Sequence, residues 1–355
     1  MRAPTKGRGA TSNRGSRYRQ QQLDVAAEYV DEGGDEPRRN PATRLHVDAS
    51  RSIIARNQSP DVPFSRSINP YRGCEHGCVY CFARPSHAWL DHSPGLDFET
   101  EIYVKPDAVR LLEEELAAPG YRPEAIHLGA NTDPYQPVER ETRLTRGILA
   151  TLLATGHPVT VLTKSALIER DVDLLSALAR RGLARAAISV TTLDAELKRT
   201  LEPRAASAAA RLRAIRTLVD AGVPTAVMVA PVIPRVNDHE LEAILEAAAA
   251  AGAGHAGWIL LRLPLELRQL MQEWLEVHRP LAARHVMSLM RASHGGRDDD
   301  PRFHHRMSGQ GPYAQLIGQR FTAGARRLGL ATGPGTPLDC TQFRPPSPGG
   351  QLALW

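Results

Sequence analysis

The sequence lacks the long apolar run that a membrane-spanning helix requires. No stretch of 18 consecutive apolar residues occurs in its 355 residues, so no transmembrane helix is expected. The N-terminus carries basic residues without the apolar segment of a secretory signal behind them. The protein is therefore expected to be cytoplasmic and to have no membrane partner.

Cysteine is scarce, and its distribution is uneven. The chain has four cysteines, and three of them, Cys74, Cys78 and Cys81, lie within one short segment. A disulfide framework would spread an even set of cysteines along a small secreted chain. The clustering instead predicts a protein of a reducing compartment with a metal or cluster site.

Acidic residues are absent from the first 20 positions, which hold six Lys and Arg residues. Without those six, 38 bases would face 39 acids, so the net charge of +5 originates in the N-terminal segment. Residues 1–45 are therefore expected to form a disordered basic arm. Attraction to nucleic-acid phosphates, a solvated tail and an organellar transit peptide all remain open for it.

Six short apolar or β-branched runs alternate with helical patterns through the middle of the chain. Helices are expected to end at Gly156, Gly182, Gly222 and Gly252, because glycine commonly terminates helices. This alternation predicts a parallel sheet with crossover helices, either as an open doubly wound sheet or as a complete or partial barrel. The expected strands lie within residues 65–72, 125–131, 158–164, 186–192, 225–233 and 257–264.

The pattern changes after Pro264. Residues 276–340 are expected to form a helical extension that follows an α/β domain at 46–275. Residues 341–355 combine a Pro- and Gly-rich linker, "RPPSPGG", with the terminal peptide "QLALW".

The cysteine segment reads "NPYRGCEHGCVYCFARPSH", with the spacing C-x3-C-x2-C. A structural zinc site needs a fourth ligand, which His76 or His87 could supply. A [4Fe–4S] cluster held by three thiols instead leaves one iron open for a cofactor or substrate. Gly73 and Gly77 would let the backbone wrap tightly around such a group.

This spacing, with the aromatic Tyr80 just before the last cysteine, resembles the signature of the radical SAM superfamily. The resemblance covers about residues 60–270 and implies a partial (β/α)6 TIM-type barrel. It also implies a [4Fe–4S] cluster ligated by Cys74, Cys78 and Cys81, and S-adenosylmethionine (SAM) with its adenine against Tyr80. Such enzymes form a 5′-deoxyadenosyl radical that abstracts hydrogen from a substrate, and they need a reductant such as flavodoxin or ferredoxin.

Further polar residues fall at the ends of the expected strands, where such folds place their active sites. The family's usual Gly-Gly-Glu is missing, and its position is taken by Asn131, Thr132 and Asp133; Asp133 or Asn131 is expected to contact the SAM amino group. The other candidates for binding SAM are Lys164, Ser189 and Thr191, with the two hydroxyls suited to the ribose, and Arg204, suited to the SAM carboxylate or a substrate phosphate.

Three stretches, "INPYRGCEHGCVYCFAR", "NTDPYQPVE" and "TKSALIERD", resemble the DNA repair photolyase-related branch of this superfamily. That branch is distantly similar to spore photoproduct lyase, which uses a further cysteine as a hydrogen donor. The remaining thiol here, Cys340, could be such a donor or a packed side chain. No motif for reading base edges is recognisable in the sequence.

The terminal "QLALW" resembles the peptide by which bacterial polymerases and repair proteins dock on the sliding clamp. Gln351, Leu352, Leu354 and Trp355 would make the contacts, and Trp355 replaces the usual Phe. A short anchor peptide on a flexible tether suits such docking. The alternative is an apolar terminus that packs on the protein itself.

Three functions remain open at this point. The first is a radical SAM enzyme, of lyase or oxidoreductase type, that acts on damaged DNA. The second keeps the radical chemistry and takes tRNA, protein or a small metabolite as substrate. The third is a zinc-stabilised nucleic-acid-binding protein without catalysis.

Overall fold

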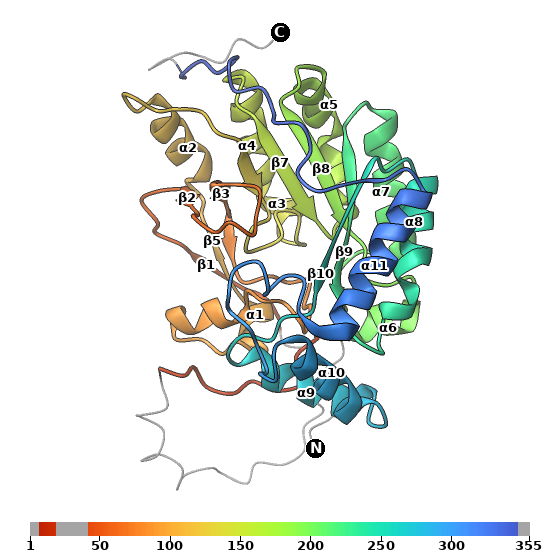
Figure 1. Cartoon of the computed structure of the whole chain (residues 1–355). Helices are drawn as coiled ribbons and strands as arrows, with labels where there is room; N and C mark the ends of the chain where they lie inside the picture. The colour runs from red at the N-terminus through yellow and green to blue at the C-terminus, as the bar shows by residue number, and fades with distance from the viewer. Residues whose placement is uncertain (1–6, 19–41, 347–355) are drawn as a thin grey trace, which may run out of the picture.

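The computed structural model describes residues 7–18 and 42–346, and its main element is an eight-stranded sheet (Figure 1). The strand order is β11-β10-β9-β8-β7-β6-β3-β2, and all neighbours are parallel except β2 and β3. The strands are β2 (Ile54–Arg56), β3 (Arg66–Ile68), β6 (Ile126–Leu128), β7 (Val159–Thr163), β8 (Ala184–Ser189), β9 (Thr225–Val232), β10 (His255–Leu260) and β11 (Ala331–Thr332).

The predicted partial (β/α)6 barrel is confirmed. Each of the six expected runs overlaps one of the parallel strands β3 and β6–β10, although β8 and β10 each begin two residues earlier than expected. Among the described strands the sheet does not close, because β2 and β11 form its two edges.

The helices between successive strands end where the glycines predict. Gly156, Gly182, Gly222 and Gly252 all have positive φ angles, which glycine adopts without steric cost. The helices are α2 (Ala108–Ala117), α4 (Leu144–Ala154), α5 (Val172–Arg180), α7 (Ala208–Asp220) and α8 (Leu241–Ala250), and shorter turns are α1 (Asp97–Thr100), α3 (Glu139–Thr142), α6 (Ala195–Leu201), η1 (Arg84–Leu90), η2 (Ala166–Asp171) and η3 (Asp238–Glu240).

The main core lies between the sheet and these helices. Ile126 and Ile188 of the strands and Leu152, Ile215 and Leu245 of the helices are all fully buried in one apolar cluster. Burial of this apolar surface holds the helices on the sheet. It also fixes the carboxyl ends of the strands next to one another.

The first expected strand, residues 65–72, is divided in two. β3 ends at Ile68, and Tyr71–Arg72 form β4 in a second sheet of order β1 (Arg44–Val47)-β5 (Glu101–Val104)-β4. Pro70 has no N–H to donate to a ladder, so the chain leaves the first sheet at this point. The division directs the cysteine segment over the end of the large sheet.

The C-terminal helices pack on both the cysteine segment and the barrel. Met271 and Trp274 of α9 (Leu267–His278) and Met287 of α10 (Ala283–Ser293) share an apolar cluster with Cys78 and Tyr80. The predicted start of this extension at residue 276 falls inside α9.

The last helix, α11 (Gly311–Arg327), lies along α8. Arg320 pairs with Glu242, and Arg327 pairs with Glu246. After α11, residues 333–346 cross the amino-terminal ends of the strands, where the Asp339 N–H donates to Gly182 O.

Residues 7–18 differ from the expected disordered arm, because they pack against the cysteine segment. The N–H groups of Gly9 and Ala10 donate to the two carboxylate oxygens of Glu99, at 3.0 and 2.8 Å. Arg17 forms an ion pair with Glu266 at 2.7 Å. Composition alone could not predict this order, since it depends on a buried carboxylate about 90 residues away.

None of the helices in the described part of the chain is long and apolar enough to span a membrane.

Candidate functional site

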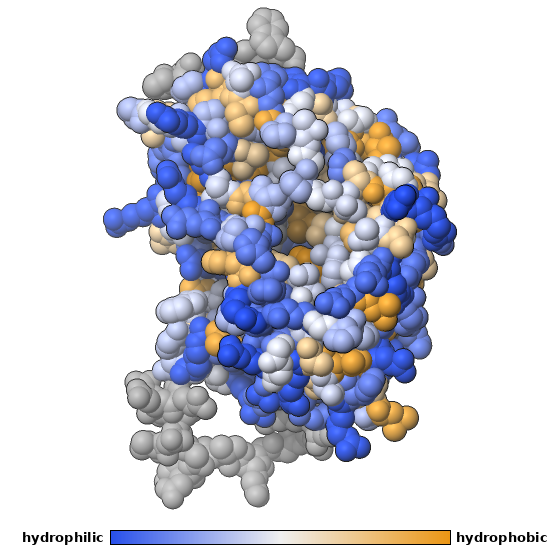
Figure 2. All heavy atoms as spheres, viewed as in Figure 1, coloured by the Kyte–Doolittle hydropathy of each residue, from blue (hydrophilic) through white to orange (hydrophobic). Residues whose placement is uncertain are grey.

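A cavity of about 200 Å³ lies at the carboxyl ends of the parallel strands, where the sequence predicts the site. The view in Figure 2 shows a hollow with apolar residues at its base. The cavity is lined by the three clustered cysteines and by residues at or just beyond the carboxyl ends of strands β6 to β10. The lining comprises Cys74, His76, Cys78, Tyr80, Cys81, Phe82, Gly129–Asp133, Leu162–Lys164, Ser189, Ala230, Pro231, Ile259–Arg262 and Met307.

The cysteine loop, defined here as residues 73–81, holds all three thiols at this cavity. Gly73 and Gly77 have φ angles of +78° and +68°, as the expected tight wrap requires. A side chain at Gly77 would meet Glu99 Oε2 at 2.8 Å. The two glycines therefore give the loop a path that a larger residue could not follow without displacing its surroundings.

Burial raises the pKa of all three thiols, and that of Cys78 reaches about 12. Metal ligation at this loop must therefore displace protons from the thiols. Three soft sulfur ligands at one cavity fit an iron–sulfur cluster that keeps one iron accessible.

The two histidines considered as a fourth ligand have other partners. His76 Nδ1 lies 3.3 Å from Asp133 Oδ2, and the His87 ring is hydrogen-bonded to Glu101 O at 3.0 Å. His87 is fully buried and does not line the cavity. In the part of the chain that the structure describes, no group of three His, Cys, Asp or Glu side chains is arranged to hold a single metal ion.

Asp133, one of two residues predicted to contact the SAM amino group, is already held by four partners. Its Oδ1 accepts from Tyr135 N and Thr163 Oγ1, and its Oδ2 accepts from Lys164 N and lies near His76. Burial raises the pKa of Asp133, but His76 and these donors outweigh burial and hold the pKa below its usual value. Asp133 thus joins the ends of β6 and β7 as a carboxylate.

Asn131 and Thr132 differ in their access to the cavity. Asn131 is exposed, and its backbone N–H donates to Asn69 Oδ1. Thr132 is buried, and its hydroxyl donates to Tyr71 O at 3.1 Å. Of the three residues at the missing Gly-Gly-Glu position, Asn131 offers the most accessible side chain.

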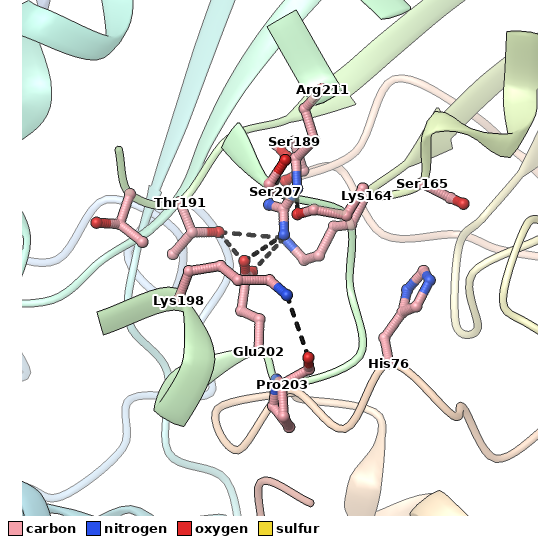
Figure 3. Close-up of polar contacts among 12 residues, drawn as sticks. His76, Lys164, Ser165, Ser189, Thr191, Lys198, Glu202, Pro203, Ser207 and Arg211 are labelled. Carbon is pink, nitrogen blue, oxygen red and sulfur yellow. Dashed lines mark hydrogen bonds and ion pairs between the residues drawn. The ribbon is translucent and has the colours of Figure 1, made fainter. Parts of the chain in front are cut away.

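Lys164 and Ser189 meet at the cavity wall, as predicted from their strand ends (Figure 3). Lys164 Nζ donates to Ser189 Oγ at 2.9 Å and to Ala230 O at 3.1 Å. Thr191, the second hydroxyl predicted to contact the ribose, is fully buried behind this wall and does not line the cavity. Its hydroxyl lies 2.8 Å from Glu202 Oε1 and 3.1 Å from Ala230 O, so its single hydrogen can be donated to either.

Sequence analysis missed the buried ion pair of Glu202 and Arg211, which underlies this wall. Arg211 Nη2 lies 2.5 Å from Glu202 Oε2, and Tyr80 donates its hydroxyl to the other carboxylate oxygen. Burial raises the pKa of Glu202, but Arg211 and Lys164 outweigh it and bring the pKa to about 2. The pair holds Tyr80 and Lys164 in place at the cavity.

A signal for Arg211 is present in the sequence. Arg211 precedes Ala214, Ile215 and Leu218 at the spacing of one helix face, and all four residues are buried in α7. A cation on an otherwise apolar face requires a buried counter-charge. That requirement could have directed attention to Glu202, two residues before the predicted Arg204 in "EPR" (202–204).

Arg204 does not line the cavity. Its guanidinium lies 3.0 Å from Glu75 Oε1 and donates to Thr43 Oγ1. Its backbone N–H donates to His76 O, so the residue lies behind the cysteine loop. The structure therefore separates Arg204 from the other residues predicted to bind SAM.

Cys340 lies near the opposite end of β6 from the cavity. Its thiol is hydrogen-bonded to Leu338 O and lies close to Ala125, which precedes β6. The cavity begins beyond the other end of this strand, at Gly129. This position fits a packed thiol rather than a hydrogen donor at the cavity.

The sequence profile of the radical SAM superfamily matches residues 68–248. An uncharacterized protein of Mycobacterium tuberculosis is 40% identical over an alignment of 232 positions, which covers 61% of this chain and 68% of the relative. An uncharacterized protein of Methanocaldococcus jannaschii is 28% identical over 173 residues, with coverage of 49% and 62%.

Solved structures of spore photoproduct lyase share the fold. The structure of that enzyme complexed with dinucleoside spore photoproduct has a TM-score of 0.59 and 14% identity, and the match covers 81% of this chain and 80% of that one. A mutant with bound AdoMet and dinucleoside spore photoproduct has a TM-score of 0.58 at 14% identity, with the same coverage.

Removal of the Glu202 charge is expected to destabilise the protein strongly. Glu202→Gln leaves the Arg211 guanidinium buried without a counter-ion, so the free energy of unfolding should fall by about 3–5 kcal/mol. Because the pKa of Glu202 is lowered from 4.5 to about 2, its contribution is complete above pH 4.5 and is lost as the pH falls towards 2. Urea unfolding between pH 7 and pH 2 measures both effects.

The matched control is Glu196→Gln on α6, where an 83% exposed carboxylate pairs with Arg199. That variant should unfold nearly as the parent does, because exposed ion pairs contribute little. Equal stability of the two variants at pH 7 would contradict the importance of the Glu202–Arg211 pair.

Proposed function

The chain belongs to the radical SAM superfamily, and from this premise we propose that it abstracts hydrogen from damaged DNA in a repair reaction. The observation that carries the proposal is the meeting of three thiols with Asn131, Lys164 and Ser189 in one cavity at the strand ends. Enzymes of this family use a [4Fe–4S] cluster and SAM, and these cofactors supply a 5′-deoxyadenosyl radical.

The residues of the cavity divide into those that would hold each cofactor. Cys74, Cys78 and Cys81 would ligate the cluster through their thiolates. The side-chain oxygen of Asn131 would accept a hydrogen bond from the SAM amino group. Asn131 is chosen because its side chain is accessible, whereas that of Asp133 is held by other partners. Ser189 and Lys164 would bind polar groups of SAM, and the Tyr80 ring would lie against the adenine.

Four of the residues predicted at the SAM site would act indirectly. Asp133 would position Lys164 through its backbone N–H, and Thr191 would position Tyr80 and Lys164 through Glu202. Arg204 would support the cysteine loop through Glu75. Thr132 would hold the segment that follows β6 against β4, through the hydrogen bond from its hydroxyl to Tyr71 O.

The walls of the cavity would exclude water from the reacting atoms. Leu162, Pro231, Ile259, Leu261 and Met307 provide apolar surface on several sides. Such a lining removes small proton and hydrogen donors from the neighbourhood of a radical. A reductant such as flavodoxin or ferredoxin would supply the electron, and the cytoplasm is the proposed location.

An exposed aromatic pair between the N-terminal segment and η1 supports a nucleic-acid substrate. Trp89 and Tyr18 are 72% and 53% exposed, and their ring centroids lie 5.2 Å apart. The Arg17 guanidinium lies 4.9 Å from the Tyr18 ring centroid. Aromatic faces next to a cation are suited to stacking on unpaired bases.

The three loop thiols should be required for the cluster, whereas Cys340 should not. Cys78→Ala removes one iron ligand, so anaerobic reconstitution should yield little iron and sulfide and no 5′-deoxyadenosine after reduction with SAM. Cys340→Ala is the matched control, because its thiol lies near the other end of β6. Iron retention with SAM cleavage in Cys78→Ala would overturn the ligand assignment. Binding of zinc in place of a cluster by the parent would favour the non-catalytic alternative.

A substrate screen tests the proposed reaction. Reconstituted protein with SAM and reductant should consume lesions in ultraviolet-irradiated DNA, measured by chromatography of the digested DNA, and leave undamaged DNA unchanged. Formation of 5′-deoxyadenosine without any change in the DNA would refute the DNA substrate. The same assay would then be applied to tRNA, proteins and small metabolites.

We also propose docking on the bacterial sliding clamp through Gln351, Leu352, Leu354 and Trp355, which lie outside the described residues. The proposal rests on the sequence "QLALW". A labelled C-terminal peptide should bind purified clamp in a fluorescence titration, and replacement of Leu354 and Trp355 by Ala should abolish binding. No binding of the unaltered peptide at tens of micromolar would refute it.

A further inference from the structure

Most charged groups of the cavity already have partners within the protein. Asp133 accepts from Lys164 N and Thr163 Oγ1, and Lys164 Nζ donates to Ser189 Oγ and Ala230 O. A ligand that recruited either of these charges would have to replace bonds that are already made. Recognition of a charged substrate therefore requires another group.

Arg262 is the exception. It follows β10, lines the cavity and is partly buried. Its Nε is buried without a hydrogen-bond partner, and within residues 7–18 and 42–346 no hydrogen bond or ion pair is found for its guanidinium. A buried donor without a partner is unfavourable, so a ligand that satisfies it gains affinity.

The acidic residues nearest to Arg262 do not neutralise it by contact. Asp61 accepts from His304 N at 2.6 Å and forms an ion pair with Arg306, so its two oxygens have partners. Asp299 acts on Arg262 through space, and one of its own oxygens is buried without a hydrogen bond. Arg306 itself lies close enough to repel Arg262.

The backbone on both sides of Arg262 is held in place by other parts of the protein. Leu260 N donates to Met307 O at 2.8 Å, which holds the loop before α11 against the end of β10. Leu261 and Leu263, on either side of Arg262, belong to the apolar cluster of Cys78 and Tyr80. The backbone of Arg262 is therefore held between this apolar cluster and the loop that carries Met307, and its side chain lines the cavity.

We propose that Arg262 binds a phosphate of the nucleic-acid substrate and thereby selects anionic substrates, an inference that rests on the function proposed above. A guanidinium can donate two parallel hydrogen bonds to phosphate oxygens, which fixes the orientation of the group as well as its distance. The SAM carboxylate has the same chemistry, so the test must separate the two sources.

The test compares a charged and an uncharged dinucleotide. Reconstituted protein is titrated calorimetrically with thymidylyl-thymidine that carries an ultraviolet lesion and with the neutral methylphosphonate analogue that carries the same lesion. We expect the parent to bind the charged dinucleotide about tenfold more tightly, and Arg262→Gln to lose this preference. Arg262→Lys should retain part of it, because lysine keeps the charge without the fork of donors.

Arg268→Gln is the matched control, because it removes an arginine from α9 that pairs with Asp298 outside the cavity. It should keep the full preference. Retention of the preference in Arg262→Gln would overturn the proposal. So would a weakened affinity for SAM in that variant with the phosphate preference intact, since Arg262 would then bind the SAM carboxylate.

Failure of the proposed function has a different signature. If the parent binds neither dinucleotide, nucleic acid is not the substrate, and titration with inorganic phosphate tests Arg262 alone. Phosphate binding by the parent that is lost in Arg262→Gln would support an anion site for another substrate. Equal binding by the two proteins, or none by the parent, would refute the anion site.

Discussion

Three buried carboxylates hold the cysteine loop, and the geometry of the site depends on them. Glu99 accepts from the N–H groups of Gly9 and Ala10 and pairs with Arg84. Glu75 accepts from Val138 N and pairs with Arg204, and Glu202 pairs with Arg211 and accepts from Tyr80. A loop without regular backbone pairing needs such partners, because its buried polar groups are otherwise unsatisfied.

The carboxylates also explain why segments distant in sequence meet at this loop. Glu99 recruits the N-terminal segment, and Glu75 connects the loop to the turn after β6. Ion pairs in such surroundings add little net stability, but the loss of one partner is costly because it leaves a charge buried. The arrangement therefore strongly disfavours alternative paths for the thiol-bearing backbone.

The sequence was sufficient for features that depend on local pattern. Apolar runs located the parallel strands, glycines located the helix ends, and strand ends located Asn131, Lys164 and Ser189 at the cavity. It was insufficient where a residue's role depends on a distant partner. Arg204 and Arg262 have the same chemistry, yet Glu75 holds the first behind the loop and no such contact holds the second among the described residues.

This difference separates residues that shape the cavity from those that can recognise a substrate. A side chain whose hydrogen bonds are made within the protein is already oriented, but a ligand gains little from it unless one bond is exchanged for another. Asp133 and the Glu202–Arg211 pair belong to this group, whereas Asn131 and Arg262 retain donors or acceptors for a ligand. Changes of substrate among proteins with this cysteine loop are therefore expected at the end of β10, where Arg262 lies, while Asn131 at the end of β6 serves the shared cofactor and the network around Glu202 preserves the shape of the shared site.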